Sequence, residues 1–405
     1  MTDPPANPHF SDVEFLLDGF EHVETREDLR ERLKLGRPLN VKLGIDPTSP
    51  DLHLGFMVVL DKLQRFAEAG HRVTWIIGDF TARIGDPSGK NITRPQLTPE
   101  EIEANMETYK RQAAKVLDLD KITVRYNSEW LDKLTITDLV KLLAKTTVAQ
   151  MLERNDFHNR YGAGTPISLH EFLYPVAQAY DSIAVSADVE LGGSDQLFNL
   201  LLGRHYQREY GQPPQICATV PLLVGLDGQK KMSKSLGNYV GITEAPSDQF
   251  GKLMKIGDEL IPTYARLAAF RPQSEFERLK RDLASGQANA MDEKKSVAEE
   301  VVARYHGSDS ARAAREHFEA TVQRKEIPSG DLPEIELGEC TRVAELLVKA
   351  GFAQSRREAE RLIAGGGVKV EGAVVSDPRA TWSAGAPAVL SVGSRRFVRV
   401  LPRKG

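Results

Sequence analysis

The sequence predicts an α/β protein with a parallel sheet in its first half, an α-helical region after it and a small α+β module at the end. Three observations indicate this fold class. Residues 41–78 read as strand, helix and strand, the unit from which parallel sheets are built. Residues 246–324 show helical patterns and no strand pattern. Residues 341–405 begin with two short helical patterns and end in short strands around 368–370 and 397–401.

The rest of the chain is organised around the first of these strands and the loop that follows it. Residues 41–45 alternate as in a strand, whereas residues 46–50 hold two prolines and cannot lie inside a helix or a strand. A helical pattern then continues to Gly70, and a second apolar strand covers residues 73–77. Ligands of parallel sheets bind beyond the carboxyl ends of the strands. We therefore expect His53 at a ligand site, beside a helix N-terminus that favours an anion.

Local patterns predict the other elements. Residues 1–40 read as a short helical lead-in, and Ser194 is expected to cap a helix that runs to about Tyr210. Capping boxes at Thr98 with Glu101, Ser168 with Glu171 and Ser355 with Glu358 are expected to open three further helices. Further strands are expected at 122–126, 185–191 and 216–224.

Composition excludes several classes of protein. Apolar residues make up 41% of the chain and charged residues 27%, as in globular proteins. Two cysteines are too few for a disulfide framework and indicate a reducing compartment. The N-terminus lacks the basic start and apolar core of a signal peptide, and no apolar run is long enough to span a bilayer. A cytoplasmic location is therefore expected.

Charge is distributed unevenly along the chain. Residues 341–405 contain 12 Lys and Arg and 5 Asp and Glu, a balance of +7, which leaves −11 on residues 1–340. The excess of basic residues at 341–405 predicts contact with RNA phosphates. The affinity for RNA is expected to fall as the salt concentration rises. The alternative is a solvated tail with a charge excess.

Two short motifs suit the binding of phosphates. His53-Leu54-Gly55 combines an imidazole donor with a glycine that allows close approach to the backbone. Residues 231–235, Lys-Met-Ser-Lys-Ser, place two lysines in a loop that could clamp a polyphosphate. Taken alone, each motif has a simpler explanation. The first would be a loop histidine without a ligand, and the second a solvated basic loop. Together and in this order they resemble the paired signature of class I aminoacyl-tRNA synthetases.

A third pattern concerns the amino acid that would be activated. Tyr174, Gln178 and Asp181 share one face of a predicted helix, although such a face is usually only solvated. Their spacing resembles the tyrosine pocket of tyrosyl-tRNA synthetases, as do the strings around Asp86 and at 192–196. The resemblance covers the first half of the chain closely and the helical region loosely. It identifies the basic tail as an S4-like RNA-binding domain.

The resemblance implies roles for individual residues. The implied tyrosine-binding residues are Asp86, Asn127, Tyr174 and Gln178 at the ammonium group, Asp181 at the phenolic hydroxyl and Gln196 at the carboxylate. The implied ATP-binding residues are Asp46, Thr48, His53, Gly55, Asp195, Lys231, Ser233 and Lys234, with Thr48, His53, Lys231 and Lys234 acting in catalysis. A buried partner for the hydroxyl rejects phenylalanine, which leaves that partner unpaired; this enzyme class is the standard example of the effect.

The implied activity is that of a tyrosine–tRNA ligase. Tyrosine attacks the α-phosphate of ATP, which comes as its Mg²⁺ complex, pyrophosphate leaves, and the tyrosyl group passes to the 3′ end of tRNA(Tyr). A homodimer is also implied, whereas no membrane, DNA, protein-bound metal or prosthetic group is expected. Two alternatives stay open: a nucleotidyltransferase that adenylates a small molecule without tRNA, and a catalytically impaired RNA-binding protein on a synthetase scaffold.

The resemblance also suggests a division into domains. It predicts a Rossmann-like catalytic domain at 1–240, with an inserted helical segment at the dimer interface at about 128–180. The other predicted parts are a helical anticodon-side domain at 241–324, a linker at 325–340 and the S4-like domain at 341–405.

Two positions depart from the family pattern. Phe56 stands where the family usually has a second histidine, and it cannot donate a hydrogen bond to a nucleotide. Lys42 stands where some members have a tyrosine that contacts the phenol, so we leave Lys42 out of the predicted site. The whole stretch from Val41 to Gly55 resembles a second bacterial subgroup of the family.

Overall fold

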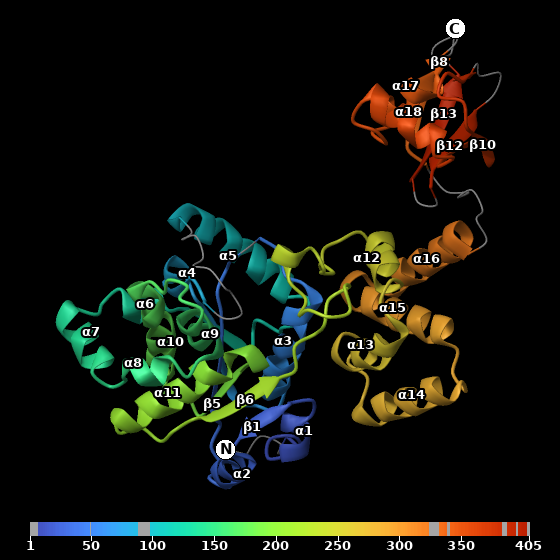
Figure 1. Cartoon of the computed structure of the whole chain (residues 1–405). Coiled ribbons are helices and arrows are strands. Elements are labelled where there is room, and N and C mark those ends of the chain that lie inside the picture. The colour runs from blue at the N-terminus through green and yellow to red at the C-terminus, as the bar shows by residue number, and fades with distance from the viewer. Residues whose placement is uncertain are drawn as a thin grey trace. The chain divides into compact units, whose positions relative to one another are not determined.

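The structure is a computed structural model that describes residues 7–48, 50–87, 98–323, 332–337, 341–382, 387–393 and 396–402. It contains two compact units (Figure 1). The first comprises Met1–Ala245 and Lys252–Tyr305, and the second comprises Pro246–Gly251 and His306–Gly405. The region predicted as one helical domain is therefore divided between the two units.

The first unit is built on a six-stranded sheet with the order β1-β6-β5-β2-β3-β4. Strands β2 to β6 pair in parallel, and β1 pairs antiparallel with β6. The strands are β1 (His22–Glu24), β2 (Asn40–Ile45), β3 (Arg72–Ile77), β4 (Ile122–Tyr126), β5 (Val189–Gly193) and β6 (Ile216–Val220). The predicted Rossmann-like parallel sheet is confirmed.

The central βαβ unit consists of β2, α3 (Leu54–Glu68) and β3. Its helix buries Leu60, Leu63 and Phe66 completely, and Trp75 of β3 is also fully buried. Burial of each such side chain stabilises the fold by about 1.5–3 kcal/mol. This unit fixes the loop between β2 and α3, which carries His53, at the carboxyl end of the sheet.

The order of the strands creates a switch point beside β2. The chain passes from β2 to β3 and β4 on one side and returns to β5 and β6 on the other. Loops that leave β2 and β5 therefore diverge, and ligands of open parallel sheets bind between such loops.

The first 40 residues contain more than the helical lead-in predicted from the sequence. Helices α1 (Val13–Leu17) and α2 (Arg26–Leu33) flank the edge strand β1. Only three residues long, β1 shows no apolar alternation that could reveal it, and it is held by backbone pairing with β6.

Capping residues start several helices of the first unit as predicted. Both reciprocal hydrogen bonds of the capping box are present at Thr98 and Glu101, which open α5 (Pro99–Ala113). The box at Ser168 opens the 3₁₀ turn η1 (Leu169–Phe172), which leads into α10 (Leu173–Ala184). The other helices of this part are α4 (Thr81–Ile84), α6 (Ser128–Leu131), α7 (Ile136–Leu143), α8 (Val148–Met151), α9 (Asn155–Gly162), η2 (Ser194–Gln196), α11 (Leu197–Glu209) and η3 (Lys234–Leu236).

Three boundaries differ from the sequence-based prediction. The strand expected at 216–224 ends at Val220. The strand expected from Val185 begins at Val189, because α10 continues to Ala184 and Ser186 adopts a positive φ of 49° in the turn that follows. Ser194 opens η2 and does not cap α11, whose N-cap is Gln196.

Helices make up the segment from residue 246 to residue 323, and no strand occurs in this described part of the chain. These elements are α12 (Pro246–Leu253), η4 (Asp258–Leu260), α13 (Ile261–Leu267), α14 (Gln273–Ser285), α15 (Ala290–His306), α16 (Ser308–Phe318) and the π-helical turn η5 (Glu319–Gln323). None of the helices among the described residues is long and apolar enough to cross a membrane.

The C-terminal part of the second unit combines two helices with two small sheets. One sheet has the order β10-β9-β12-β13-β7, and the other pairs β11 with β8. The elements are β7 (Glu334–Leu337), β8 (Thr341–Arg342), α17 (Val343–Lys349), α18 (Arg356–Ala364), β9 (Val368–Val370), β10 (Ala373–Val375), β11 (Thr381–Trp382), β12 (Ala388–Val392) and β13 (Arg396–Pro402). Val343, Leu347, Ile363 and Leu390 lie in its own hydrophobic core.

The linker predicted at 325–340 contains a strand. Glu334–Leu337 form β7, which pairs in parallel with β13 at the edge of the sheet. Because β7 is short and every second residue in it is a glutamate, its sequence alone looks like a polar connection. Ser355 caps α18 by accepting a hydrogen bond from the Glu358 backbone N–H, whereas the reciprocal bond of the predicted capping box is replaced by one from the Gln354 backbone N–H to Glu358.

Candidate active site

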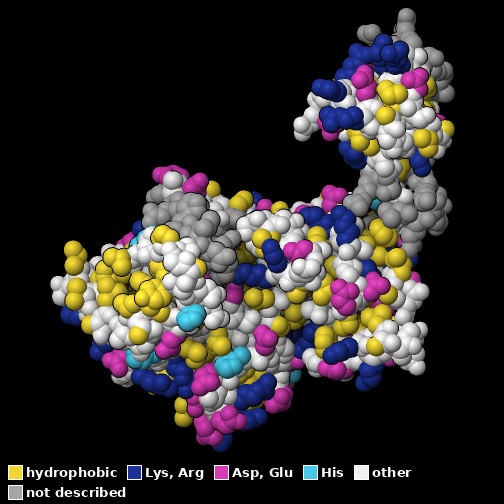
Figure 2. Space-filling view, in the orientation of Figure 1, with side chains coloured by type: hydrophobic (Ala, Val, Ile, Leu, Met, Phe, Trp, Pro, Cys, Tyr) yellow, Lys and Arg dark blue, Asp and Glu magenta, His cyan; other side chains and the backbone are white. Residues whose placement is uncertain are grey.

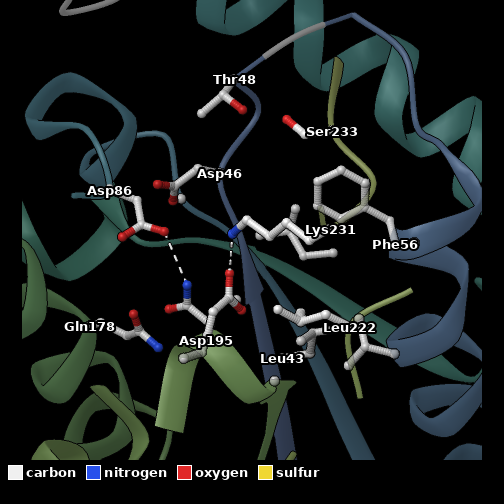
Figure 3. Close-up of a pocket in the computed structure, with 18 of the residues that line it drawn as sticks. Leu43, Asp46, Thr48, Phe56, Asp86, Gln178, Asp195, Leu222, Lys231 and Ser233 are labelled. Carbon is white, nitrogen blue, oxygen red and sulfur yellow. Dashed lines mark hydrogen bonds and ion pairs between the residues drawn. The ribbon is translucent and has the colours of Figure 1, made fainter. Parts of the chain in front are cut away.

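One cavity of about 690 Å³ lies in the first unit, where the loops leave the carboxyl ends of the parallel strands. Figure 3 shows how residues from distant segments point into it. Every residue assigned to ATP, tyrosine or catalysis from the sequence lines this cavity: Asp46, Thr48, His53, Gly55, Asp86, Asn127, Tyr174, Gln178, Asp181, Asp195, Gln196, Lys231, Ser233 and Lys234. The residues predicted to bind phosphates and the polar face of α10 therefore line one cavity.

The polar face of α10 is turned inward and is not a solvated surface. Asp181 is buried, and its carboxylate accepts hydrogen bonds from Trp130 Nε1 at 2.7 Å and from Asn127 Nδ2 at 3.3 Å. Burial raises the pKa of Asp181 to about 7, an effect that the nearby charge of Lys42 opposes. Ionised Asp181 is therefore a strong acceptor that is costly to leave unpaired.

Asn127 lies at the Asp181 end of the cavity. Its Nδ2 donates to Thr81 Oγ1 at 3.0 Å as well as to Asp181, and its Oδ1 accepts from the Phe80 backbone N–H at 2.9 Å. Asn127 thus helps to hold the carboxylate of Asp181, and its predicted place near a substrate ammonium group stays a prediction.

Asp86 and Gln196 form the second polar cluster in the cavity. Gln196 Nε2 donates to Asp86 at 3.0 Å, and Arg154 pairs with the other Asp86 oxygen at 3.1 Å. Asn199 donates to Gln178 Oε1 at 3.0 Å and to Gln196 Oε1 at 2.8 Å. The sequence did not reveal Arg154 or Asn199, because neither belongs to a motif and they come from separate segments, Arg154 from the turn before α9 and Asn199 from α11.

Tyr174 lies between this cluster and Asp46, which follows β2. Its ring is buried, and the carboxylates of Asp46 and Asp86 act on its hydroxyl. Burial and the two carboxylates Asp46 and Asp86 raise the pKa of Tyr174, so its hydroxyl stays protonated and donates. Asp46 also accepts from Thr81 Oγ1 at 2.7 Å.

His53 occupies the N-cap of α3 at the opposite end of the cavity. Its Nδ1 accepts a hydrogen bond from the Gly55 backbone N–H at 3.2 Å, so the neutral ring carries its proton on Nε2. Burial and the charges of Lys234 and Lys231 lower the pKa of His53 to about 4. A Cβ on residue 55 would lie 3.0 Å from the His53 ring, so Gly55 makes room for that ring.

The two lysines of the basic loop are both paired with carboxylates. Lys231 Nζ lies 2.5 Å from Asp195 Oδ2, as Figure 3 shows, and Lys234 Nζ lies 3.1 Å from Asp51 Oδ2. Lys234 also lies over the ring of Tyr239, 5.7 Å from its centroid. Sequence reasoning did not single out Asp51, which directly precedes Leu52 in the predicted loop. Both lysines thus have carboxylate partners that an anionic ligand could replace.

The two departures from the family pattern have different positions. Phe56 lines the cavity, and its ring centroid lies 4.6 Å from that of His53 (Figure 3). Lys42 is not among the residues that line the cavity; it is buried behind it and pairs with Glu190 at 3.1 Å.

Known proteins share this architecture. The model of the tRNA synthetases class I (W and Y) family matches residues 34–323, and the S4 domain model matches residues 341–385. This chain belongs to the class I tRNA synthetases. The resemblance inferred from its motifs is thereby confirmed, and so is the S4 module at its end.

Relatives of this class I synthetase are similar over nearly its whole length. It is 52% identical to the tyrosine–tRNA ligase of Ralstonia nicotianae, with 94% of this chain and 96% of the relative covered. It is 50% identical to the tyrosine–tRNA ligase of Moorella thermoacetica, with 96% and 95% covered. The solved structure of the Archaeoglobus fulgidus tyrosyl-tRNA synthetase with L-tyrosine is 25% identical, with a TM-score of 0.62 over 75% of this chain and 98% of that one.

Proposed function

We propose that this class I synthetase is a tyrosine–tRNA ligase, which activates L-tyrosine with ATP and transfers it to tRNA(Tyr). One observation carries the proposal: Asp181, His53 and Lys234 line the same cavity, so a phenol acceptor and phosphate-binding groups face one space. The tyrosine–tRNA ligases that share about half of its residues support the assignment.

Asp181 selects the substrate side chain in this proposal. Trp130 and Asn127 hold its carboxylate, which accepts the hydrogen bond of the phenolic hydroxyl. Phenylalanine would bury the same carboxylate without a partner, so it binds less well.

The amino-acid end of tyrosine would lie at the second polar cluster. Asp86, Tyr174 and Gln178 offer oxygen atoms to the ammonium group, and Gln196 directs an amide toward the carboxylate. Asp86 is already held by Gln196 and Arg154, so its position is fixed before the substrate arrives. Such preorganisation lowers the entropic cost of reaching the reactive geometry.

The nucleotide would occupy the end of the cavity near His53 and the basic loop. Neutral His53 donates from Nε2, and Lys231 and Lys234 exchange Asp195 and Asp51 for phosphate oxygens. Asp46, Thr48, Ser233 and the backbone at Gly55 complete the nucleotide contacts. ATP enters as its Mg²⁺ complex, which neutralises part of the phosphate charge.

The reaction needs no nucleophile from the protein. The carboxylate oxygen of tyrosine attacks the α-phosphorus, the bond to the bridging oxygen breaks, and pyrophosphate leaves with the negative charge. Lys231 and Lys234 stabilise that charge as it develops, and the site supplies rate through positioning and electrostatics. The tRNA ribose hydroxyl then attacks the tyrosyl carbonyl, and AMP leaves.

Partners of the enzyme include tRNA and, in our proposal, a second copy of the chain. Exposed apolar side chains gather on α7 and α8, including Ile136, Val140 and Val148, and form the apolar patch over these helices in Figure 2. This segment lies within the predicted insertion at 128–180. We propose that the catalytic region, the helical region and the S4 domain act as successive modules, with the dimer formed through this insertion.

Two assays in sequence test the proposed function. Tyrosine-dependent exchange of pyrophosphate into ATP measures the first step, and charging of total tRNA with tyrosine measures the second. We expect both activities. Absence of exchange would refute the ligase, whereas exchange without charging would favour a nucleotidyltransferase that does not use tRNA.

A further inference from the structure

A buried ion pair lies behind the tyrosine end of the cavity. Lys42 of β2 and Glu190 of β5 are partners in the parallel register of the sheet, and Lys42 Nζ lies 3.1 Å from Glu190 Oε1. Both side chains are only 1% exposed. Neither is among the residues that line the cavity.

Stability alone is a weak explanation for such a pair. Removing two charges from water costs free energy that their mutual attraction often fails to recover, and apolar replacements are frequently neutral or stabilising. The surrounding contacts point to another role. Both members of the pair hold the same residue of the site.

Gln178 is bound by the pair at two points. Its side-chain Nε2 donates to Glu190 Oε1 at 3.1 Å, and its backbone carbonyl accepts from Lys42 Nζ at 3.2 Å. A carboxylate can only accept, so Glu190 fixes which end of the Gln178 amide faces it. The amide oxygen is thereby directed away from Glu190, where it accepts from Asn199 Nδ2 at 3.0 Å.

This orientation decides what Gln178 offers to a ligand. An amide presents either a donor or an acceptor, and the two orientations have nearly the same shape. A substrate ammonium group needs an acceptor, which the fixed orientation supplies. Glu190 therefore sets the polarity of a residue that it holds from outside the cavity.

The same pair also acts on Asp181, one turn further along α10. The charged groups that affect this carboxylate are Lys42 from β2, which favours its ionised form, and Glu190 from β5, which opposes it. The uncharged donors Trp130 of α6 and Asn127, which precedes α6, also favour the ionised form. Lys42 and Glu190 thus have opposite effects on one acceptor.

We propose that Lys42 and Glu190 are positioning residues for tyrosine recognition: Glu190 orients the Gln178 amide so that its oxygen can accept from the substrate ammonium group, and Lys42 holds both Glu190 and the backbone carbonyl of Gln178 in place. This inference rests on the proposed ligase function. It assigns a role to a lysine at a position where some members of the family have a tyrosine in contact with the phenol.

Two substitutions that remove charges of opposite sign from the pair provide the test. The kcat/KM for tyrosine is measured in pyrophosphate exchange from pH 5.5 to 8.5 for wild type, Lys42→Met and Glu190→Gln. We expect the midpoint of its acid limb to move up in Lys42→Met and down in Glu190→Gln, each by about half a pH unit or more. At pH 8, Glu190→Gln should raise the KM for tyrosine about tenfold, with kcat and the KM for ATP within about twofold.

Ser182→Ala is the matched control. Ser182 Oγ donates to the other carboxylate oxygen, Glu190 Oε2, at 3.2 Å, so its removal leaves the bond between Glu190 Oε1 and the Gln178 amide in place. Its removal should change thermal stability and leave the KM for tyrosine and the pH midpoint unchanged. A purely structural role for the pair would likewise lower stability without moving either kinetic quantity.

The outcomes separate this inference from the function on which it depends. If wild type shows no tyrosine-dependent exchange, the proposed function fails and the inference falls with it. If wild type is active and Glu190→Gln keeps both the KM for tyrosine and the midpoint of wild type, the inference alone is overturned. Glu190→Gln is nearly isosteric, so it keeps the test decisive if Lys42→Met does not fold.

Discussion

Trp130 Nε1 donates a hydrogen bond to Asp181 Oδ1 at 2.7 Å, so the carboxylate at this end of the cavity is oriented by the protein itself. Asp181 is 3% exposed. The lone pairs of this carboxylate that accept no hydrogen bond from the protein therefore face the cavity. Recognition of a phenolic hydroxyl requires this arrangement.

Substitution of Asp181 should remove selectivity for tyrosine. We expect Asp181→Ala to lower the ratio of kcat/KM for tyrosine over phenylalanine about 10- to 100-fold, because the hydroxyl loses a charged partner. Pyrophosphate exchange with each amino acid measures the ratio. Trp130→Phe, which keeps the carboxylate but removes one of its donors, should have a smaller effect. An unchanged ratio in Asp181→Ala would refute the assigned role.

Loss of the second lysine in the basic loop should slow the first chemical step. Lys234→Ala is expected to reduce the rate of adenylate formation by about 100-fold or more, because charge on the departing pyrophosphate loses a stabilising partner. Rapid-quench kinetics measures this rate, and tyrosine affinity should change little. Lys230→Ala, at an exposed position in the same loop, serves as the control. Normal adenylate formation in Lys234→Ala would remove that residue from the mechanism.

His53 should make the fold less stable in mild acid. Its folded-state pKa of about 4 lies below the ordinary value of 6.5, so between these limits the unfolded chain binds the proton and stability falls as pH falls. At pH 5 the cost is about 2 kcal/mol. His53→Asn, which can still cap α3, should therefore lose less stability than wild type between pH 7 and pH 5.

Thermal unfolding at the two pH values measures this difference. Asp181, whose pKa is raised to about 7, contributes with the opposite sign, so only the comparison between variant and wild type isolates His53. His158→Asn changes an exposed histidine and should behave as wild type. Equal losses in His53→Asn and wild type would show that His53 is not buried in its neutral form.

The apolar surface of α7 should hold two chains together. Ile136 is 84% exposed and Val140 is 60% exposed, which is costly for a helix that has no partner. We expect the double substitution Ile136→Asp with Val140→Asp to convert a dimer into a monomer in sedimentation equilibrium. Lys280→Asp, on an exposed position of α14, should leave the mass unchanged. A monomeric wild type would contradict the proposal.

Removal of the S4 domain should separate the two steps of the reaction. Since β7 belongs to the sheet of that domain, the cut is best placed after Gln323. The truncated enzyme should retain tyrosine-dependent exchange and charge tRNA more weakly. Its affinity for tRNA should also depend less on salt concentration, because basic residues that contact phosphates have been removed. Undiminished charging would show that the domain serves another purpose.

Much of the fold could be predicted because its determinants are local. The apolar periodicity of residues 41–77 was enough to predict β2, α3 and β3, and the capping box at Thr98 predicted the start of α5. The three-residue β1 and the polar strand β7 could not be predicted, because their stability comes from partners far away in the sequence.

By itself the sequence determined the family, the βαβ unit and the residues that line the cavity, because spacing along a helix and the order of two short motifs are properties of a linear chain. Only the tertiary structure decided that Trp130 and Asn127 hold Asp181, that Arg154 holds Asp86, and that a pair behind the cavity holds Gln178. These contacts join side chains from separate elements, and packing of those elements against one sheet brings them within hydrogen-bonding distance.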